Sequence, residues 1–273
     1  MRWVQTVAVV ILAFATVLPK QACADDIDDL IELSGLTVQL TTDGDEAAAA
    51  FLEEFEASGT PMPGREFVDM VREFFRGIDY APLMKTVLAE GLSRRQTRRL
   101  LRWYRSDLGR RITALEVSAA QPEEMERMMA QLDSLLEDED RLARAAKLDE
   151  LLSLTDSLLS TTLTSQVAIV TGILRSSGVD ETTLESTLKQ IEAATLAERE
   201  QFEQLSQALG SYTYRALSDT EFDRYLEFLA RPEAQRFYDL IMGTLERQSM
   251  SDMGRLGDRI GAFLIDARGP SQT

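Results

Sequence analysis

The sequence predicts an all-α protein in which two helical-bundle repeats pack together behind a signal peptide. Apolar residues recur at helical spacing in segment after segment, and few segments alternate with period 2. The sequence Leu92-Ser-Arg-Arg-Gln96 has a counterpart 125 residues later, Leu217-Ser-Asp-Thr-Glu221. The amino terminus has the pattern of an export signal. The elements that support this prediction are taken in chain order below.

Residues 1–24 have the composition of a cleaved signal peptide. Arg2 provides a positive start, and the apolar run that follows ends at Leu18, which is shorter than the roughly 20 residues of a membrane-spanning helix. Ala22-Cys23-Ala24 fits the small-x-small cleavage rule, so cleavage is expected after Ala24. An uncleaved anchor and lipidation of Cys23 remain open as alternatives. We expect a periplasmic protein with no transmembrane helix after processing.

The composition excludes several classes of function. The chain of 273 residues has a formal charge of −17, which argues against nucleic-acid binding. It contains no histidine and only one cysteine, so His-based triads, Cys-His nucleophiles and His- or Cys-ligated metal sites are absent. The calcium-loop pattern is also missing. We therefore expect no cofactor and no metal.

Several helices are predicted outside the repeated motif. Two apolar stripes at helical spacing consist of Phe67, Met70, Val71, Phe74 and Phe75, and of Leu184, Leu188 and Ile191. The β-branched cluster from Thr161 to Thr171 lies between helical patterns and is interpreted as a buried helix, with a strand as the alternative. The pattern from Pro122 to Leu159 predicts a long helix that joins the halves, with a kink near residues 137–140.

Each half contains the same predicted helix start, a capping box. The serine accepts a hydrogen bond from the amide three residues on, and the Gln or Glu side chain returns to the serine amide. The two boxes consist of Ser93 with Gln96 and of Ser218 with Glu221. In the second copy Leu217 and Phe222 add a hydrophobic staple, where the first copy has Thr97.

About one helix later each half turns a corner into another helix. Ser106 suits the cap position in the first copy, and Pro232 suits the first helical position in the second. Gly109 and Ala234 occupy equivalent positions, and their small size predicts close helix packing. The aligned motif places the first repeat at 25–145 and the second at 146–268, followed by a disordered tail at 269–273.

The first corner carries a recognisable pattern, Trp103-Tyr104-Arg105-Ser106-Asp107-Leu108-Gly109-Arg110-Arg111. It resembles the bacterial domain-of-unknown-function 2059 family, whose pattern is aromatic-Tyr-x-Ser-Pro-x-Gly-x-Lys after a Leu-Ser/Thr-x-x-Glu helix start. Asp107 stands in place of the proline, and Arg111 in place of the lysine. The second corner keeps Phe228, Pro232 and Arg236 but has Leu229, Arg231 and Ala234 at the tyrosine, serine and glycine positions. The resemblance implies two diverged copies of a secreted or periplasmic helical domain with no assigned activity, and it carries over no catalytic residue.

Arginines are concentrated between residues 94 and 111. Arg95, Arg98, Arg102 and Arg105 fall opposite the apolar face of their predicted helix, so they are expected to point outward. Guanidinium groups pair bidentately with phosphate, which makes this face a candidate for binding lipid headgroups or lipopolysaccharide phosphate. The alternative is a solvated face that pairs with the protein's own acids.

The remaining signals do not single out a catalytic residue. Glu185 is a candidate for single-glutamate lytic chemistry, yet no substrate-groove motif surrounds it. Six methionines lie on two helical patterns and belong either to packed core or to an apolar groove: Met125, Met128, Met129, Met242, Met250 and Met253. We expect a non-catalytic envelope protein, a binding, scaffold or chaperone-like factor whose partner is an unknown envelope protein or lipid. The alternative is a carboxylate-dependent cell-wall hydrolase.

Overall fold

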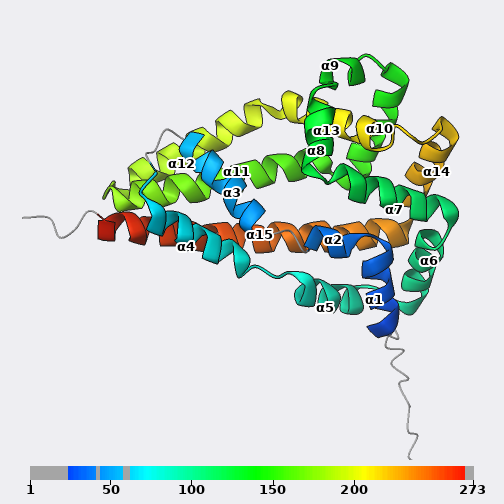
Figure 1. Ribbon diagram of the computed structural model, residues 1–273, viewed down its shortest axis with the longest axis horizontal. Coiled ribbons are helices and arrows are strands. Elements are labelled where there is room, and N and C mark those ends of the chain that lie inside the picture. Colours follow the sequence, from blue (N-terminus) through cyan, green and yellow to red (C-terminus); the bar gives the residue numbers. More distant parts are fainter. Residues whose placement is uncertain (1–23, 41–43, 58–61, 268–273) are drawn as a thin grey trace, which may run out of the picture.

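The computed structural model describes residues 24–40, 44–57 and 62–267, and within these ranges the chain forms helices and no strand (Figure 1). The all-α prediction is therefore confirmed. The predicted signal peptide up to Cys23 and the predicted tail lie outside the described residues. The molecule is elongated, and its longest helix, α15 (Pro232–Ala267), runs along most of its length.

The helices of the first half of the chain are mostly short. They are α1 (Ala24–Leu33), α2 (Leu36–Leu40), α3 (Gly44–Ala57), α4 (Arg65–Arg76), α5 (Ala81–Gly91), α6 (Arg94–Tyr104), α7 (Asp107–Ala119), α8 (Pro122–Met129) and α9 (Leu132–Leu135). The second half contains longer helices. They are α10 (Glu139–Leu152), α11 (Leu154–Ser176), α12 (Glu181–Ala197), α13 (Arg199–Thr213), α14 (Asp219–Leu229) and α15.

The predicted apolar stripe on α4 packs against α3 and against the last part of α15. Phe67, Val71 and Phe74 are buried on one face of α4. The ring of Phe67 lies 4.8 Å from that of Phe55 on α3 and 5.4 Å from that of Phe263 near the end of α15. This aromatic cluster holds α3 and α4 on the far end of α15, away from the repeated motifs.

Helix α11 lies along α15, and the two backbones approach closely where both carry small residues. A Cβ atom added to Gly257 would lie 2.7 Å from the carbonyl oxygen of Ala168, and one added to Gly172 would lie 2.7 Å from the carbonyl oxygen of Gly257. The segment from Thr161 to Thr171 is thus a packed helix, and the strand alternative is wrong.

One helix in the described part of the chain, α11, is long and apolar enough to span a membrane by length and composition alone. It packs against α15, α12 and α13, and 22% of its apolar stretch is buried inside the molecule. Length and composition therefore do not assign it to a membrane.

The long joining helix predicted from Pro122 to Leu159 is wrong, because the chain breaks there into α8, α9, α10 and the start of α11. Asp138 caps α10 by accepting a hydrogen bond from the amide of Arg141, close to the predicted kink. Ser153 adopts a left-handed backbone with φ of 53°, which ends α10 and starts α11. The apolar periodicity spans these breaks: Met128 is buried on α8 and Leu148 on α10, whereas no residue of α9 is fully buried.

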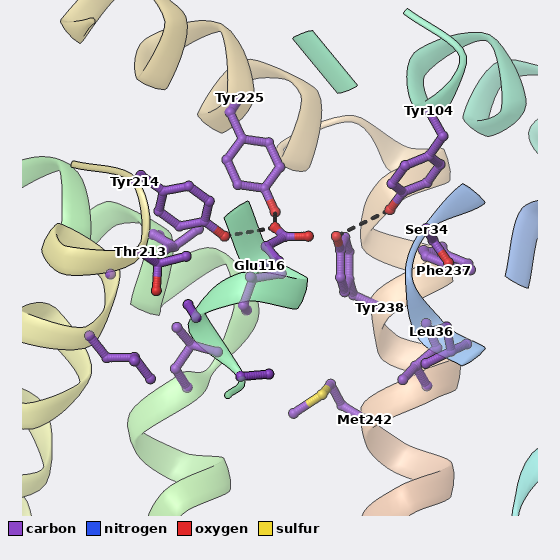
Figure 2. A pocket seen from close by; sticks show the side chains of 18 of the residues that line it. Ser34, Leu36, Tyr104, Glu116, Thr213, Tyr214, Tyr225, Phe237, Tyr238 and Met242 are labelled. Carbon is purple, nitrogen blue, oxygen red and sulfur yellow. Dashed lines mark hydrogen bonds between the residues drawn. The ribbon is translucent and has the colours of Figure 1, made fainter. Parts of the chain in front are cut away.

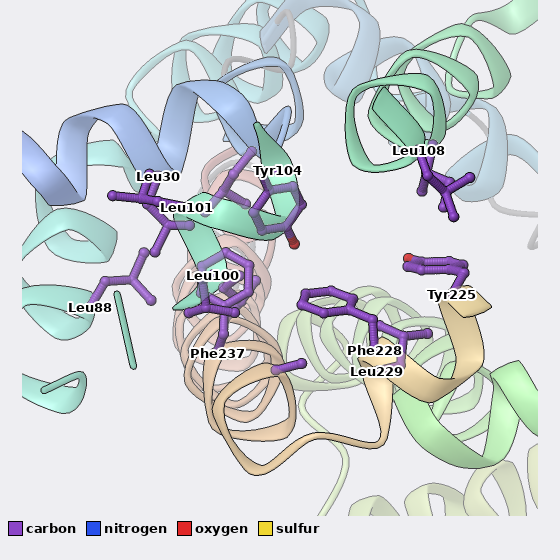
Figure 3. Close-up of a cluster of buried hydrophobic side chains, with 14 of the residues drawn as sticks. Leu30, Leu88, Leu100, Leu101, Tyr104, Leu108, Tyr225, Phe228, Leu229 and Phe237 are labelled. Carbon is purple, nitrogen blue, oxygen red and sulfur yellow. The ribbon is translucent and has the colours of Figure 1, made fainter. Parts of the chain in front are cut away.

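The largest hydrophobic core is shared by both halves of the chain. It contains Leu30, Leu88 and Leu100 from the first half and Phe228 and Phe237 from the second (Figure 3). The indole of Trp103 stacks on Phe228 at 4.2 Å with an interplanar angle of 6°. The core therefore crosses the predicted repeat boundary near residue 145.

Both predicted capping boxes are present. The hydroxyl of Ser93 accepts from the amide of Gln96, and the hydroxyl of Ser218 accepts from the amide of Glu221. Leu217 and Phe222 are both buried, as a hydrophobic staple requires. In the first copy Thr97 is also buried, and its hydroxyl donates to the carbonyl of Ser93.

The two corners contact each other across the molecule in a reciprocal way. The guanidinium of Arg111 donates to the carbonyl of Ala216, and that of Arg236 donates to the carbonyl of Gly91. The two donors, Arg111 and Arg236, are 125 residues apart, and so are the two acceptors, Gly91 and Ala216. This spacing equals the offset found in the sequence. This symmetry supports the repeat, which stays a prediction.

Candidate ligand-binding cavity

A cavity of about 320 Å³, open to the surface on one side, lies between α7, α10, α13, α14 and α15, near the turn from α1 to α2 (Figure 2). Most of its lining is apolar. The apolar side chains include Leu148, Leu152, Leu209, Ile241 and Met242. Such a cavity suits the apolar part of a small molecule.

The polar part of the lining includes four tyrosines and one glutamate, together with Ser34 and Thr213. The hydroxyls of Tyr214 and Tyr225 both donate to Oε1 of Glu116, at 2.7 and 2.6 Å. The hydroxyls of Tyr104 and Tyr238 lie 3.2 Å apart and share a hydrogen bond. Figure 2 shows the second oxygen of Glu116 directed toward the side where Tyr238 lies. No described residue donates a hydrogen bond to that oxygen.

Burial sets the protonation of this cluster. Removal from bulk water raises the pKa of Glu116, while the hydrogen bonds from Tyr225 and Tyr214 act in the opposite direction. Burial also raises the pKa of Tyr104, Tyr214, Tyr225 and Tyr238 well above the ordinary phenol value of 10.0, so all four stay neutral. The cavity thus offers hydroxyl donors and acceptors around a single carboxyl group.

The backbone that holds this cluster comes from both halves of the chain. Glu116 lies on α7, which Ser106 caps by accepting from the amide of Gly109 at 3.1 Å. Tyr214 immediately follows α13, and Tyr225 lies in the middle of α14. A Cβ atom on Gly109 would lie within 2.9 Å of the backbone of Trp103, so the corner needs glycine at this position, as its predicted packing role requires.

One family model matches the segment of the chain that includes α7. Residues 81–138 match the DUF2059 family. Its description is "Uncharacterized protein conserved in bacteria", and the match confirms the resemblance read from the first corner. Searches of curated proteins and of solved structures find no match.

The DUF2059 segment extends from α5 to just beyond α9, so it contributes Tyr104 and Glu116 to the cavity. The tyrosines that donate to Glu116 come from outside it, at residues 214 and 225. The family match ends before the second corner, and the second copy remains a prediction from the offset of 125 residues.

A larger and more polar hollow of about 800 Å³ adjoins the first cavity. Met242 lines both, so the two meet at this flexible side chain. Asp156, Ser160 and Glu246 lie among the polar residues of the second hollow, between α11 and α15. This hollow offers a more polar environment beside the apolar cavity.

The methionines divide between the two interpretations made from sequence. Met125 and Met242 line the first cavity, and Met242 and Met253 line the second hollow. Met128 is packed in the core, whereas Met129 and Met250 are exposed. The methionines therefore form no single groove among the described residues.

The four predicted outward arginines on and after α6 do not act as one free surface. Arg105 pairs with Asp29 of α1 at 2.5 Å, and Arg98 donates to the carbonyl of Arg94. Arg95 is exposed, and Arg102 lines a separate hollow that is described below. Glu185 is exposed on α12 and lines neither the tyrosine-lined cavity, nor the hollow beside it, nor the one that contains Arg102.

Sequence reasoning missed Glu116 and the tyrosines around it. Glu116 follows Leu108 and Ile112 at spacings of four residues, so it continues the buried face of α7. A carboxylate on an apolar helical face was the signal available. No group of acidic residues in the described ranges is arranged to hold a metal ion.

Proposed function

We propose that this protein is a non-catalytic binding protein of the bacterial envelope that holds a small amphiphilic molecule in the tyrosine-lined cavity. The observation that carries the proposal is the pairing of an apolar lining with a hydrogen-bonded Glu116–tyrosine cluster in one cavity. Ligand sites combine apolar walls with a few convergent polar groups in this way.

The cavity chemistry favours a ligand with an alkyl part and a hydroxyl-type head. A hydroxyl both donates and accepts, so it can pair with Oε2 of Glu116 whether the carboxyl is protonated or ionised. The apolar walls bury the alkyl part. A carboxylate head is disfavoured, because its charge would lose hydration against the apolar walls and none of the described lining residues is a lysine or arginine that could pair with it.

Export supports a role in the envelope. The amino-terminal pattern up to Ala24 predicts that the protein leaves the cytoplasm. The mature chain would carry −19 and no cysteine, because the first 24 residues contain Arg2, Lys20 and Cys23. A scaffold or chaperone-like role in the envelope is compatible with a cavity that accepts an amphiphile.

Binding of 1-decanol to the full chain tests the proposal by isothermal titration calorimetry. Ala119 lines the cavity, whereas Ala114 lies on the same helix and is exposed. We expect Ala119→Phe to weaken binding by about tenfold or more, because the larger side chain occupies ligand space, and Ala114→Phe to leave it unchanged.

Equal affinities in these two variants, or no saturable binding by the parent protein, would contradict the proposal. Native mass spectrometry of the protein isolated from its envelope fraction provides a second readout. A bound small amphiphile that is present in the parent protein and absent from Ala119→Phe supports the same site.

One observation favours the alternative, a carboxylate-dependent cell-wall hydrolase. Burial raises the pKa of Glu116, and a general acid needs a carboxyl that keeps its proton near the working pH. Incubation with purified peptidoglycan separates the two functions. Release of muropeptides that stops in Glu116→Gln, but not in the exposed Glu185→Gln, would replace the binding proposal with the hydrolase.

A further inference from the structure

A third hollow, of about 560 Å³, lies where the two corners of the chain meet. It is formed by the α6–α7 corner and the α14–α15 corner, on the outside of the stacked Trp103 and Phe228 rings. Its lining includes Arg99, Arg102, Trp103, Arg224, Arg231 and Glu233. Arg99 and Arg224 occupy equivalent positions at the offset of 125 residues, so each half supplies positive charge.

The hollow has an excess of positive charge in a protein that is strongly acidic overall. Glu233 is the acidic residue in its lining, and it pairs with Arg99 at 3.2 Å. Arg102, Arg224 and Arg231 form no ion pair with any residue that the structure describes. Arginines nearby behave differently, since Arg105 pairs with Asp29 and Arg111 pairs with Glu221.

An acidic residue lies close in sequence to two of these arginines, yet the described ion pairs do not include it. Glu227 lies on α14, three residues after Arg224 and four before Arg231, a spacing at which helical ion pairs form. The described ion pairs do not include Glu227. Three guanidinium groups without an ion pair therefore line one hollow, and only Arg224 has a further carboxylate near enough to interact with it, that of Glu221, which pairs with Arg111.

Two further features increase the attraction for an anion. The indole Nε1 of Trp103 is buried and has no hydrogen-bond acceptor in the described part of the chain. A buried donor without a partner is unfavourable, and Trp103 is one of the residues that line the hollow. The hollow also lies at the start of α7 and at the start of α15, where the helix dipoles are positive.

We propose that this hollow binds a phosphate-bearing anion. Guanidinium groups donate two parallel hydrogen bonds to phosphate oxygens, and a phosphate or diphosphate has enough oxygens and charge for several arginines at once. A single carboxylate neutralises only one of them. The phosphate belongs either to a soluble molecule or to a lipid headgroup, and the two sources present the same chemistry to the arginines.

The test compares two double variants of the full chain that each remove two positive charges. Arg102→Ser with Arg224→Ser removes one guanidinium from each half of the hollow. Arg95→Ser with Arg98→Ser removes two exposed arginines of the same helix α6 that lie outside it. Because the change in net charge is equal, long-range electrostatics affects both variants alike.

Inorganic pyrophosphate is the soluble probe, and Trp103 reports on its binding. The chain has two tryptophans, so a Trp3→Phe background leaves Trp103 as the single indole. We expect a saturable change in fluorescence whose dissociation constant rises by about tenfold or more in Arg102→Ser/Arg224→Ser and stays the same in Arg95→Ser/Arg98→Ser. Sodium acetate at equal ionic strength should produce no saturable change.

Sedimentation with vesicles containing phosphatidic acid is the second arm. Pyrophosphate binding that depends on Arg102 and Arg224 supports a soluble ligand, and vesicle binding with the same dependence, without pyrophosphate binding, supports a lipid phosphate. The proposal is overturned if neither probe binds, or if both double variants lose binding equally. Circular dichroism of the variants distinguishes a lost site from a lost fold.

Discussion

At the scale of single residues, Glu116 is the side chain with the most unusual environment. One of its oxygens accepts two tyrosine hydrogen bonds, and the other faces a cavity with apolar walls. Burial favours the protonated carboxyl because the charged form loses its hydration. The stability of the protein therefore depends on the protonation of Glu116.

Glu116→Gln should change how stability depends on pH. The folded-state pKa of Glu116 is raised above its ordinary value of 4.5, so the stability that protonation contributes is complete below that value and is lost as pH rises through the folded pKa. Glutamine does not titrate, so the variant should become more stable relative to the parent over this window. The expected gain is about 1.4 kcal/mol for each unit of pKa shift.

Urea unfolding at a series of pH values from acid to neutral measures this difference. Glu185→Gln, at an exposed position on α12, is the matched control and should show a difference that does not grow with pH over this window. A pH-independent difference for Glu116→Gln would mean that burial does not perturb this carboxyl.

At the scale of elements, the close contact of α11 with α15 depends on glycine. A Cβ atom added to Gly257 would lie 2.7 Å from the carbonyl oxygen of Ala168. Gly172 lies on the α11 side of the same contact, where an added Cβ would lie 2.7 Å from the carbonyl oxygen of Gly257. Gly254 lies one turn earlier on α15 and has no atom within 4 Å of its Cβ position. Glycine therefore has opposite consequences at two positions that lie one turn apart on the same helix.

Gly257→Ala should destabilise the protein, and Gly254→Ala should stabilise it. The first substitution forces the two helices apart, at a cost of about 1–3 kcal/mol. The second adds helix propensity without a clash and is worth up to about 1 kcal/mol. Thermal unfolding of the two variants measures both effects. If Gly257→Ala stabilised the protein, the two helices would have to lie further apart than in this structure.

At the scale of the whole molecule, the two halves are joined by one core. Leu30 and Leu100 pack with Phe228 and Phe237, and Arg99 of α6 pairs with Glu233 of α15. The reciprocal contacts from Arg111 and Arg236 bind each corner to the other half. Each half therefore lacks a complete core of its own.

Neither half should fold alone. We expect fragments 25–145 and 146–268 to lack cooperative unfolding transitions, because separation exposes the apolar surface that each buries against the other. In the full chain, Trp103 fluorescence in the Trp3→Phe background and far-ultraviolet circular dichroism should give one coincident urea transition. A cooperative transition in either fragment would indicate an independent domain.

The sequence by itself determined the features that depend on neighbours along the chain. The all-α class follows from periodicity, and the boxes at Ser93 and Ser218 follow from bonds that span three residues. The corner pattern near Trp103 also identified the family that residues 81–138 match. The long helix after Pro122 was predicted wrongly, because periodicity does not register a left-handed residue such as Ser153.

Only the tertiary structure decided where chemistry is concentrated. The hydrogen bonds to Glu116 join residues 98 and 109 positions apart, and the bond from Tyr104 to Tyr238 spans 134. Arg102 is exposed, as the sequence predicted, but only the packing of the second corner brings it into one hollow with Arg224. Contacts of this length arise from how helices pack, and helical periodicity specifies which face is buried without specifying against which partner.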